Sequence, residues 1–132
     1  MSFRCDHLHL RSRDAVAAAR FYTEVLGARE TGRDGTPVVT RIMLELGGLA
    51  LFIEQAPETI GPAATPPNLG IEHIGFRVDD IEAAVSDLNA RGIRLVSGIT
   101  DVRPGLRIAF FDGPDGVRIE VLQRGEPVRA QG

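Results

Sequence analysis

The feature that most constrains this 132-residue sequence is an internal repeat at an offset of half its length. Residues 6–11 (DHLHLR) resemble residues 72–77 (EHIGFR), and an alanine-rich stretch follows each segment. His7 and His73 hold equivalent places in the two segments, 66 positions apart. Repeated segments of this kind indicate repeated structural units, so the fold is expected to contain one arrangement of elements twice.

Each half is predicted to begin with a strand and a helix. In both repeated segments apolar residues alternate with polar residues or glycine, which is the period of a half-buried strand. Asp14 and Asp80 stand where helix N-caps are expected, and Gly27 and Gly92 stand where a left-handed residue after a helix is expected. Two helices of about three turns are therefore predicted.

Each half is also predicted to end in a β-hairpin. Gly47-Gly48 supplies the turn in the first half and residues 113–116 (GPDG) supply it in the second. Residues 56–70 hold four prolines and two glycines and read as a linker. We predict an α+β fold of two tandem βαβββ modules that form a cup-shaped mixed sheet with the helices outside. The expected single domain spans 1–132, with module one at 4–55, the linker at 56–70, module two at 71–123 and a tail at 124–132.

Composition excludes several classes of protein. The single cysteine, Cys5, rules out an internal disulfide framework and a cysteine-based zinc cage. An isoelectric point near 5.6 argues against a nucleic-acid surface. No apolar run reaches the roughly 18 residues of a membrane span, and we expect a soluble cytoplasmic protein with no membrane partner. The expected partner is a small molecule.

Strand alternation places polar residues on the sheet faces that point away from the helices. Among them are His7, His73 and Glu120, which would converge if the two sheets curve into one cup. Two imidazoles and one carboxylate hold Fe(II) in non-haem oxygenases and also suit Mn, Ni, Co or Zn. The alternative is a vestigial polar patch, in which an arginine satisfies Glu120.

The same face holds the other candidate site residues. His9 is a candidate for orienting or protonating the substrate, and Glu54 is a candidate general base or substitute ligand. Their alternatives are a pocket-wall residue and a solvated residue at a strand end. The planar guanidinium of arginine binds anionic groups well, and phenylalanine side chains can form the apolar wall of a pocket. The alternative for the arginines is that they form surface ion pairs. The candidate substrate-binding residues are Arg11, Phe52, Arg77, Arg107 and Phe111.

With these motifs the chain resembles the vicinal oxygen chelate superfamily. That superfamily includes glyoxalase I, methylmalonyl-CoA epimerase, extradiol dioxygenases, fosfomycin-resistance enzymes and bleomycin-resistance proteins. The resemblance covers nearly all of residues 6–123. It implies paired modules around one divalent metal ion and a homodimer. Carried over by position, His7, His73 and Glu120 fall on metal-ligand positions.

One position departs from the family pattern. Glyoxalase I and the epimerase have a Glu or Gln ligand where this sequence has Phe52, and a phenyl ring cannot coordinate a metal. The leading expectation is a glyoxalase-like lyase or isomerase that acts on a small, oxygen-rich, anionic substrate through a metal-stabilised enolate or enediolate. One alternative is an extradiol-type Fe(II) dioxygenase. The other is a metal-free binding protein of the bleomycin-resistance type.

Overall fold

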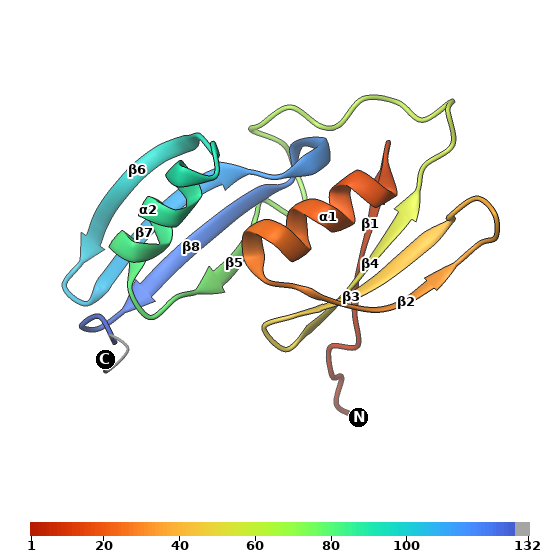
Figure 1. The fold of residues 1–132 in the computed structure, drawn as a ribbon. Helices are drawn as coiled ribbons and strands as arrows, with labels where there is room; N and C mark the ends of the chain where they lie inside the picture. The colour runs from red at the N-terminus through yellow and green to blue at the C-terminus, as the bar shows by residue number, and fades with distance from the viewer. Residues whose placement is uncertain (129–132) are drawn as a thin grey trace. The chain divides into compact units, whose positions relative to one another are not determined.

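The computed structural model describes residues 1–128, which group into two compact units with the boundary at Ala63 and Ala64 (Figure 1). Each unit contains a four-stranded sheet and one α-helix. The last four residues of the predicted tail, 129–132, lie outside the described part of the chain.

The first unit has the strand order β1-β4-β3-β2. Strand β1 runs parallel to β4, and the other neighbouring strands are antiparallel. A helix crosses from β1 to β2 and packs on one face of the sheet (Figure 1). Its elements are β1 (Leu8–Ser12), α1 (Ala15–Leu26), β2 (Arg29–Asp34), β3 (Arg41–Leu46) and β4 (Leu49–Gln55).

The second unit repeats this arrangement with the strand order β5-β8-β7-β6. Strand β5 runs parallel to β8, and the rest of the sheet is antiparallel. The predicted βαβββ order is therefore confirmed in both units. The elements are β5 (Ile74–Arg77), α2 (Ile81–Ala90), β6 (Leu95–Arg103), β7 (Leu106–Asp112), a short 3-10 helix (Pro114–Gly116) and β8 (Arg118–Arg124).

Local signals in the sequence set the ends of the helices as predicted. The Asp14 carboxylate accepts a hydrogen bond from the backbone N–H of Ala17 at 3.0 Å, and Asp80 accepts one from Ala83 at 3.2 Å. Gly27, just after α1, has a φ of 76°, in the left-handed region that favours glycine. Both predicted N-caps and this left-handed residue are confirmed.

Two glutamines that were not predicted to do so also bind the helix starts. Gln55 Oε1 accepts a hydrogen bond from the N–H of Ala15, and Gln123 Oε1 accepts one from Ile81, each at 2.9 Å. Both glutamines come from the last strand of their own unit. They tie each helix to its sheet by satisfying a backbone donor that the helix itself leaves unpaired.

The core of each unit lies between the helix and the central strands. In the first unit the buried side chains alternate along β3 and β4, as period-two patterning predicts. In the second unit the same alternation is seen in β7 from Ala109 to Phe111 and in β8 up to Val121, after which Leu122 and Gln123 are also buried. The central core residues are Ile42, Leu44, Leu51 and Ile53 in the first unit and Ala109, Phe111, Ile119 and Val121 in the second.

The repeat does not keep a constant offset along the two units. Leu51 on β4 and Ile119 on β8 hold equivalent places but are 68 positions apart. Leu44 pairs with Leu51 and Phe111 pairs with Ile119, so these two partners are equivalent at an offset of 67. Because adjacent strand residues point to opposite faces, the change from 66 to 67 reverses the predicted facing of β7.

Two site predictions are corrected by this shift. Phe111 was expected on the face away from the helix, but it is fully buried in the core, and Phe110 instead pairs with Glu120 on the outer face. Arg107 was expected on the same outer face, but its guanidinium is bonded to Glu82 of α2 at 3.3 Å. The predicted facing of both side chains is wrong, and their part in substrate binding stays a prediction.

Two further predictions concern the whole chain. No helix within residues 1–128 has the length and apolar character needed to cross a membrane. The closure of both sheets into one cup, and the single-domain boundaries, stay predictions.

Candidate metal centre

In the second unit two predicted metal ligands lie side by side. His73 Nε2 is 3.6 Å from Glu120 Oε2, and the Glu120 side chain is only 15 % exposed. Glu120 lies on β8 beside Gly75 of β5 in the parallel register. A Cβ at Gly75 would lie 3.3 Å from Glu120 Oε1, so the absence of a side chain at this position leaves room for the carboxylate.

The His73 ring is held on two further sides. Its Nδ1 contacts a carboxylate oxygen of Glu72, the preceding residue. The ring also meets Phe110 edge to face, with the ring centroids 5.2 Å apart. These contacts leave Nε2 as the nitrogen directed toward Glu120.

The 3.6 Å spacing of this pair is slightly wider than that of two ligands on one cation. Two ligands that each lie about 2.0 to 2.2 Å from one metal ion, at usual coordination angles, are roughly 3.0 to 3.5 Å apart, so a shared cation would require the two side chains to approach by about 0.1 Å or more. Imidazole nitrogen and carboxylate oxygen both suit Fe, Mn, Co, Ni and Zn. Within residues 1–128 no group of three or more His, Cys, Asp or Glu side chains is gathered around one point. The structure therefore brings together two of the three predicted ligands, and the third, His7, belongs to the other unit.

In the first unit His7 has surroundings similar to those of His73. Its Nδ1 lies 2.7 Å from Asp6 Oδ2, again a carboxylate of the preceding residue. Its ring stacks on Phe52, with the centroids 4.4 Å apart and the planes inclined by 20°. Phe52 pairs with His9 on β1 as Glu120 pairs with Gly75 on β5, so the phenyl ring holds the position of the carboxylate of the second unit.

The two predicted catalytic residues lie together in the first unit. Glu54 Oε1 is 3.3 Å from His9 Nε2, and its other oxygen accepts a hydrogen bond from Arg11 Nε at 2.9 Å. The hydrogen bond from Arg11, aided by the charges of Arg11 and His9, lowers the pKa of Glu54 below its ordinary value. Glu54 is therefore ionised at neutral pH and is a weakened proton acceptor.

We expect Arg11→Met to raise the pKa of Glu54 toward its ordinary value. The ion pair favours the ionised carboxylate, so its stabilising effect is present above the pKa of the unfolded chain and is lost as the pH falls through the lowered pKa. A carboxyl-carbon NMR titration measures the shift. Arg33→Met is the matched control, because Arg33 lowers the pKa of Glu30 in the same way on β2. A titration of Glu54 that does not change in Arg11→Met would contradict the assignment.

The remaining predicted substrate residues differ in their surroundings. Arg11 is bonded to Glu54. The guanidinium of Arg41 lies over the Phe52 ring, 5.6 Å from the ring centroid. Arg77 is exposed on β5 and donates a hydrogen bond to the Arg124 carbonyl at 3.5 Å. Arg11 and Arg107 donate to carboxylates, whereas Arg77 donates to a backbone carbonyl.

Phe110, Asp6 and Glu72 were not predicted as parts of the site. A signal for the two acids was present, because an acidic residue precedes the equivalent histidine in both repeated segments. No comparable signal marked Phe110, since its facing depends on the register of β7.

The family model for the glyoxalase/bleomycin resistance protein/dioxygenase superfamily matches residues 4–121. This chain belongs to that superfamily. The superfamily resemblance read from the motifs is therefore confirmed, and the repeated βαβββ units are the form that the fold takes here.

Individual superfamily relatives cover most of the chain. The uncharacterized protein YwbC of Bacillus subtilis is 33% identical over 131 residues, covering 94% of this chain and all of that protein. A probable chloroplastic lactoylglutathione lyase of Arabidopsis thaliana is 29% identical over 90% of this chain, which matches 35% of that longer protein. A crystal structure of a glyoxalase family protein from Enterococcus faecalis has a TM-score of 0.75 at 27% identity, covering 89% of this chain and 94% of the other.

Proposed function

We propose that this superfamily member is a metal-dependent lyase or isomerase of the glyoxalase type, acting on a small, oxygen-rich, anionic substrate. The observation that carries the proposal is the His73–Glu120 pair, with a ligand nitrogen and a ligand oxygen 3.6 Å apart. His7 would complete the ligand set. The similarity to the Arabidopsis lyase supports the reaction class.

The bound metal ion would act as a Lewis acid that stabilises negative charge developing on substrate oxygens. The residues of the chain then bind the substrate and move its proton. His9 is the proton carrier in this proposal, because Glu54 contacts its Nε2 and is itself a weakened base. Glu54 orients the imidazole, and Arg77 binds an anionic group of the substrate.

A second candidate is favoured by the contact between His7 and Phe52. The phenyl ring stacked on His7 stands where a fourth ligand would stand, which leaves two histidines and one glutamate. That set is the facial triad of Fe(II) oxygenases, so an extradiol-type dioxygenase is the alternative reaction.

Metal analysis of protein purified without chelators tests the metal-dependent proposal. We expect close to one equivalent of a divalent metal and a rise in melting temperature on metal addition. Less than about one tenth of an equivalent, with no rise in melting temperature, would leave the metal-free binding protein as the surviving reading. Oxygen uptake with catechols after Fe(II) loading, against turnover of lactoylglutathione, separates the two reactions.

The homodimer stays a prediction, and analytical ultracentrifugation measures the oligomeric state.

We expect Phe52→Glu to tighten binding of Ni²⁺, because it adds a carboxylate beside His7 at the position equivalent to Glu120. We expect the affinity for Ni²⁺ to increase at least about tenfold, because a change of one residue that supports a metal site typically alters the metal affinity by about 10- to 100-fold. Titration calorimetry of the metal-free protein measures it. Met43→Glu is the matched control. Met43 pairs with Phe52 from the neighbouring strand β3, and its replacement by Glu adds the same charge close by. Equal affinities in Phe52→Glu and the wild type would mean that Phe52 does not occupy a ligand position.

A further inference from the structure

We propose that Asp6 and Glu72 are positioning residues that select the imidazole tautomer of His7 and of His73, so that Nε2 of each ring is the nitrogen available to a metal ion. This inference rests on the proposed metal-dependent function. It assigns a task to two acidic residues that neither act as ligands nor touch the substrate in the proposed function.

The same contact occurs independently in both units. Asp6 Oδ2 lies 2.7 Å from His7 Nδ1, and Glu72 Oε2 contacts His73 Nδ1. Adjacent side chains of a strand point to opposite faces and cannot meet in this way. Both pairs lie just before the first strand of their unit, since β1 begins at Leu8 and β5 at Ile74. The change from Asp to Glu between the repeats keeps the acceptor and changes only its reach.

The chemistry of the contact determines which nitrogen keeps the proton. An ionised carboxylate can only accept, so it holds the imidazole proton on Nδ1 and leaves the lone pair on Nε2. At His73 the competing acceptor is Glu120, whose oxygen is 3.6 Å from Nε2, beyond hydrogen-bond distance. Histidine ligands in metal sites commonly donate their second N–H to a carboxylate in this way.

Aromatic contacts complete the orientation of each ring. Phe52 lies against the face of His7, and Phe110 meets His73 at an interplanar angle of 81°. These rings restrict the imidazole plane, while the carboxylate distinguishes the two nitrogens within that plane. Restricting both properties before the cation arrives lowers the entropy lost on binding.

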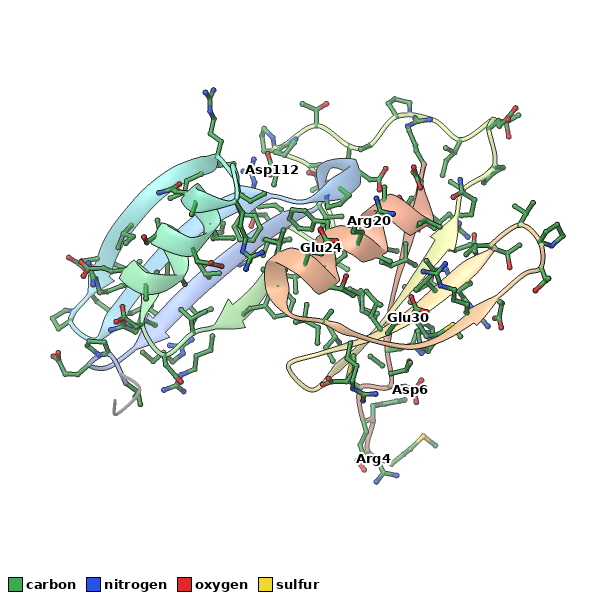
Figure 2. All side chains as sticks on the ribbon, viewed as in Figure 1. Arg4, Asp6, Arg20, Glu24, Glu30 and Asp112 are labelled. Carbon is green, nitrogen blue, oxygen red and sulfur yellow. The ribbon has the colours of Figure 1, made fainter. Side chains whose placement is uncertain are left out.

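Both acids can be replaced without disturbing the core. The Glu72 side chain is 60 % exposed and the Asp6 side chain is 89 % exposed. Figure 2 shows Asp6 on the N-terminal segment that leads into β1. Variants at these positions therefore report on the histidines rather than on folding.

The test measures tautomers by nitrogen-15 NMR of the metal-free protein near pH 8.5, about two units above the ordinary pKa of histidine. We expect the Nδ1–H form at His73 in the wild type and a shift toward the Nε2–H form in Glu72→Leu. Glu72→Gln keeps an oxygen acceptor and is expected to restore the Nδ1–H form. Asp6→Leu is expected to produce the same shift at His7.

Ni²⁺ affinity, measured by titration calorimetry, gives the second readout. Glu72→Leu is expected to weaken binding roughly 10- to 100-fold, and Glu72→Gln is expected to recover part of the loss. Glu58→Leu is the matched control, because it removes the same charge from an exposed residue of the first unit. Its affinity is expected to equal that of the wild type.

The outcomes separate this inference from the function on which it rests. Tautomer populations that are unchanged in Glu72→Leu would overturn the inference, as would an equal loss of affinity in Glu58→Leu. A wild-type protein that binds no Ni²⁺ would overturn the proposed function instead, and the tautomer measurement would still decide the role of the two acids.

Discussion

Replacement of Phe111 by alanine is expected to lower the free energy of unfolding by about 3 to 5 kcal/mol, the usual cost of removing a buried phenylalanine. Phe111 is fully buried between the sheet and α2 of the second unit, where it pairs with Ile119 on β8. The loss is a large fraction of the roughly 5 to 15 kcal/mol that stabilises a typical domain. Urea denaturation followed by circular dichroism measures it.

Phe110→Ala is the matched control on the next residue of the same strand. Phe110 is half-buried on the outer face and touches the His73 ring, so its removal is expected to cost clearly less stability. A larger loss in Phe110→Ala than in Phe111→Ala would mean that the assigned facing of β7 is reversed. The pair of variants thus tests the correction to the predicted site directly.

Replacement of His73 by alanine is expected to weaken Ni²⁺ binding by at least about 100-fold. Loss of a residue that only hydrogen-bonds to a metal ligand usually costs about 10- to 100-fold, and loss of the ligand itself should cost more. His73 and Glu120 are the two proposed ligands in the second unit, and without the imidazole a cation would keep only the carboxylate of this pair. Titration calorimetry of the metal-free protein measures the loss. The melting temperature of the metal-free variant is measured as well, to separate lost metal binding from lost stability, because the His73 side chain is only 32 % exposed.

His9→Ala is the control for the loss of an imidazole. His9 contacts Glu54 and lies outside the proposed ligand set, so this variant should bind Ni²⁺ as tightly as the wild type. Retained binding in His73→Ala, or an equal loss in His9→Ala, would contradict the ligand assignment.

Much of the fold could be predicted because its signals are local. Asp14 and Asp80 cap the helices as expected, since an N-cap depends only on the few residues around it. The hairpin at Gly47-Gly48 follows from two adjacent residues with positive φ, of 59° and 88°. Alternation along β4 and β8 assigned the outer-face positions of Phe52 and Glu120 correctly.

The candidate site was predicted less completely because its details depend on register. A constant offset of 66 aligned β3 with β7 one residue out of phase, which moved Phe111 and Arg107 to the wrong face. The alternation within β7 was visible, but an apolar pair such as Phe110 and Phe111 does not reveal which member faces the helix. The ion pair that weakens Glu54 as a base was also invisible, because Arg11 and Glu54 are 43 positions apart.

The sequence by itself determined the repeated order of elements, the helix caps, the hairpin turns and the pair of equivalent histidines, because each depends on neighbouring residues or on a visible repeat. Only the tertiary structure decided the partners across strands: Glu120 beside His73, Phe52 against His7 and Phe111 in the core. The physical reason is that a strand reverses the facing of every side chain with a shift of one residue. Two small changes in the repeat interval therefore altered which side chains meet, while leaving the order of the elements unchanged.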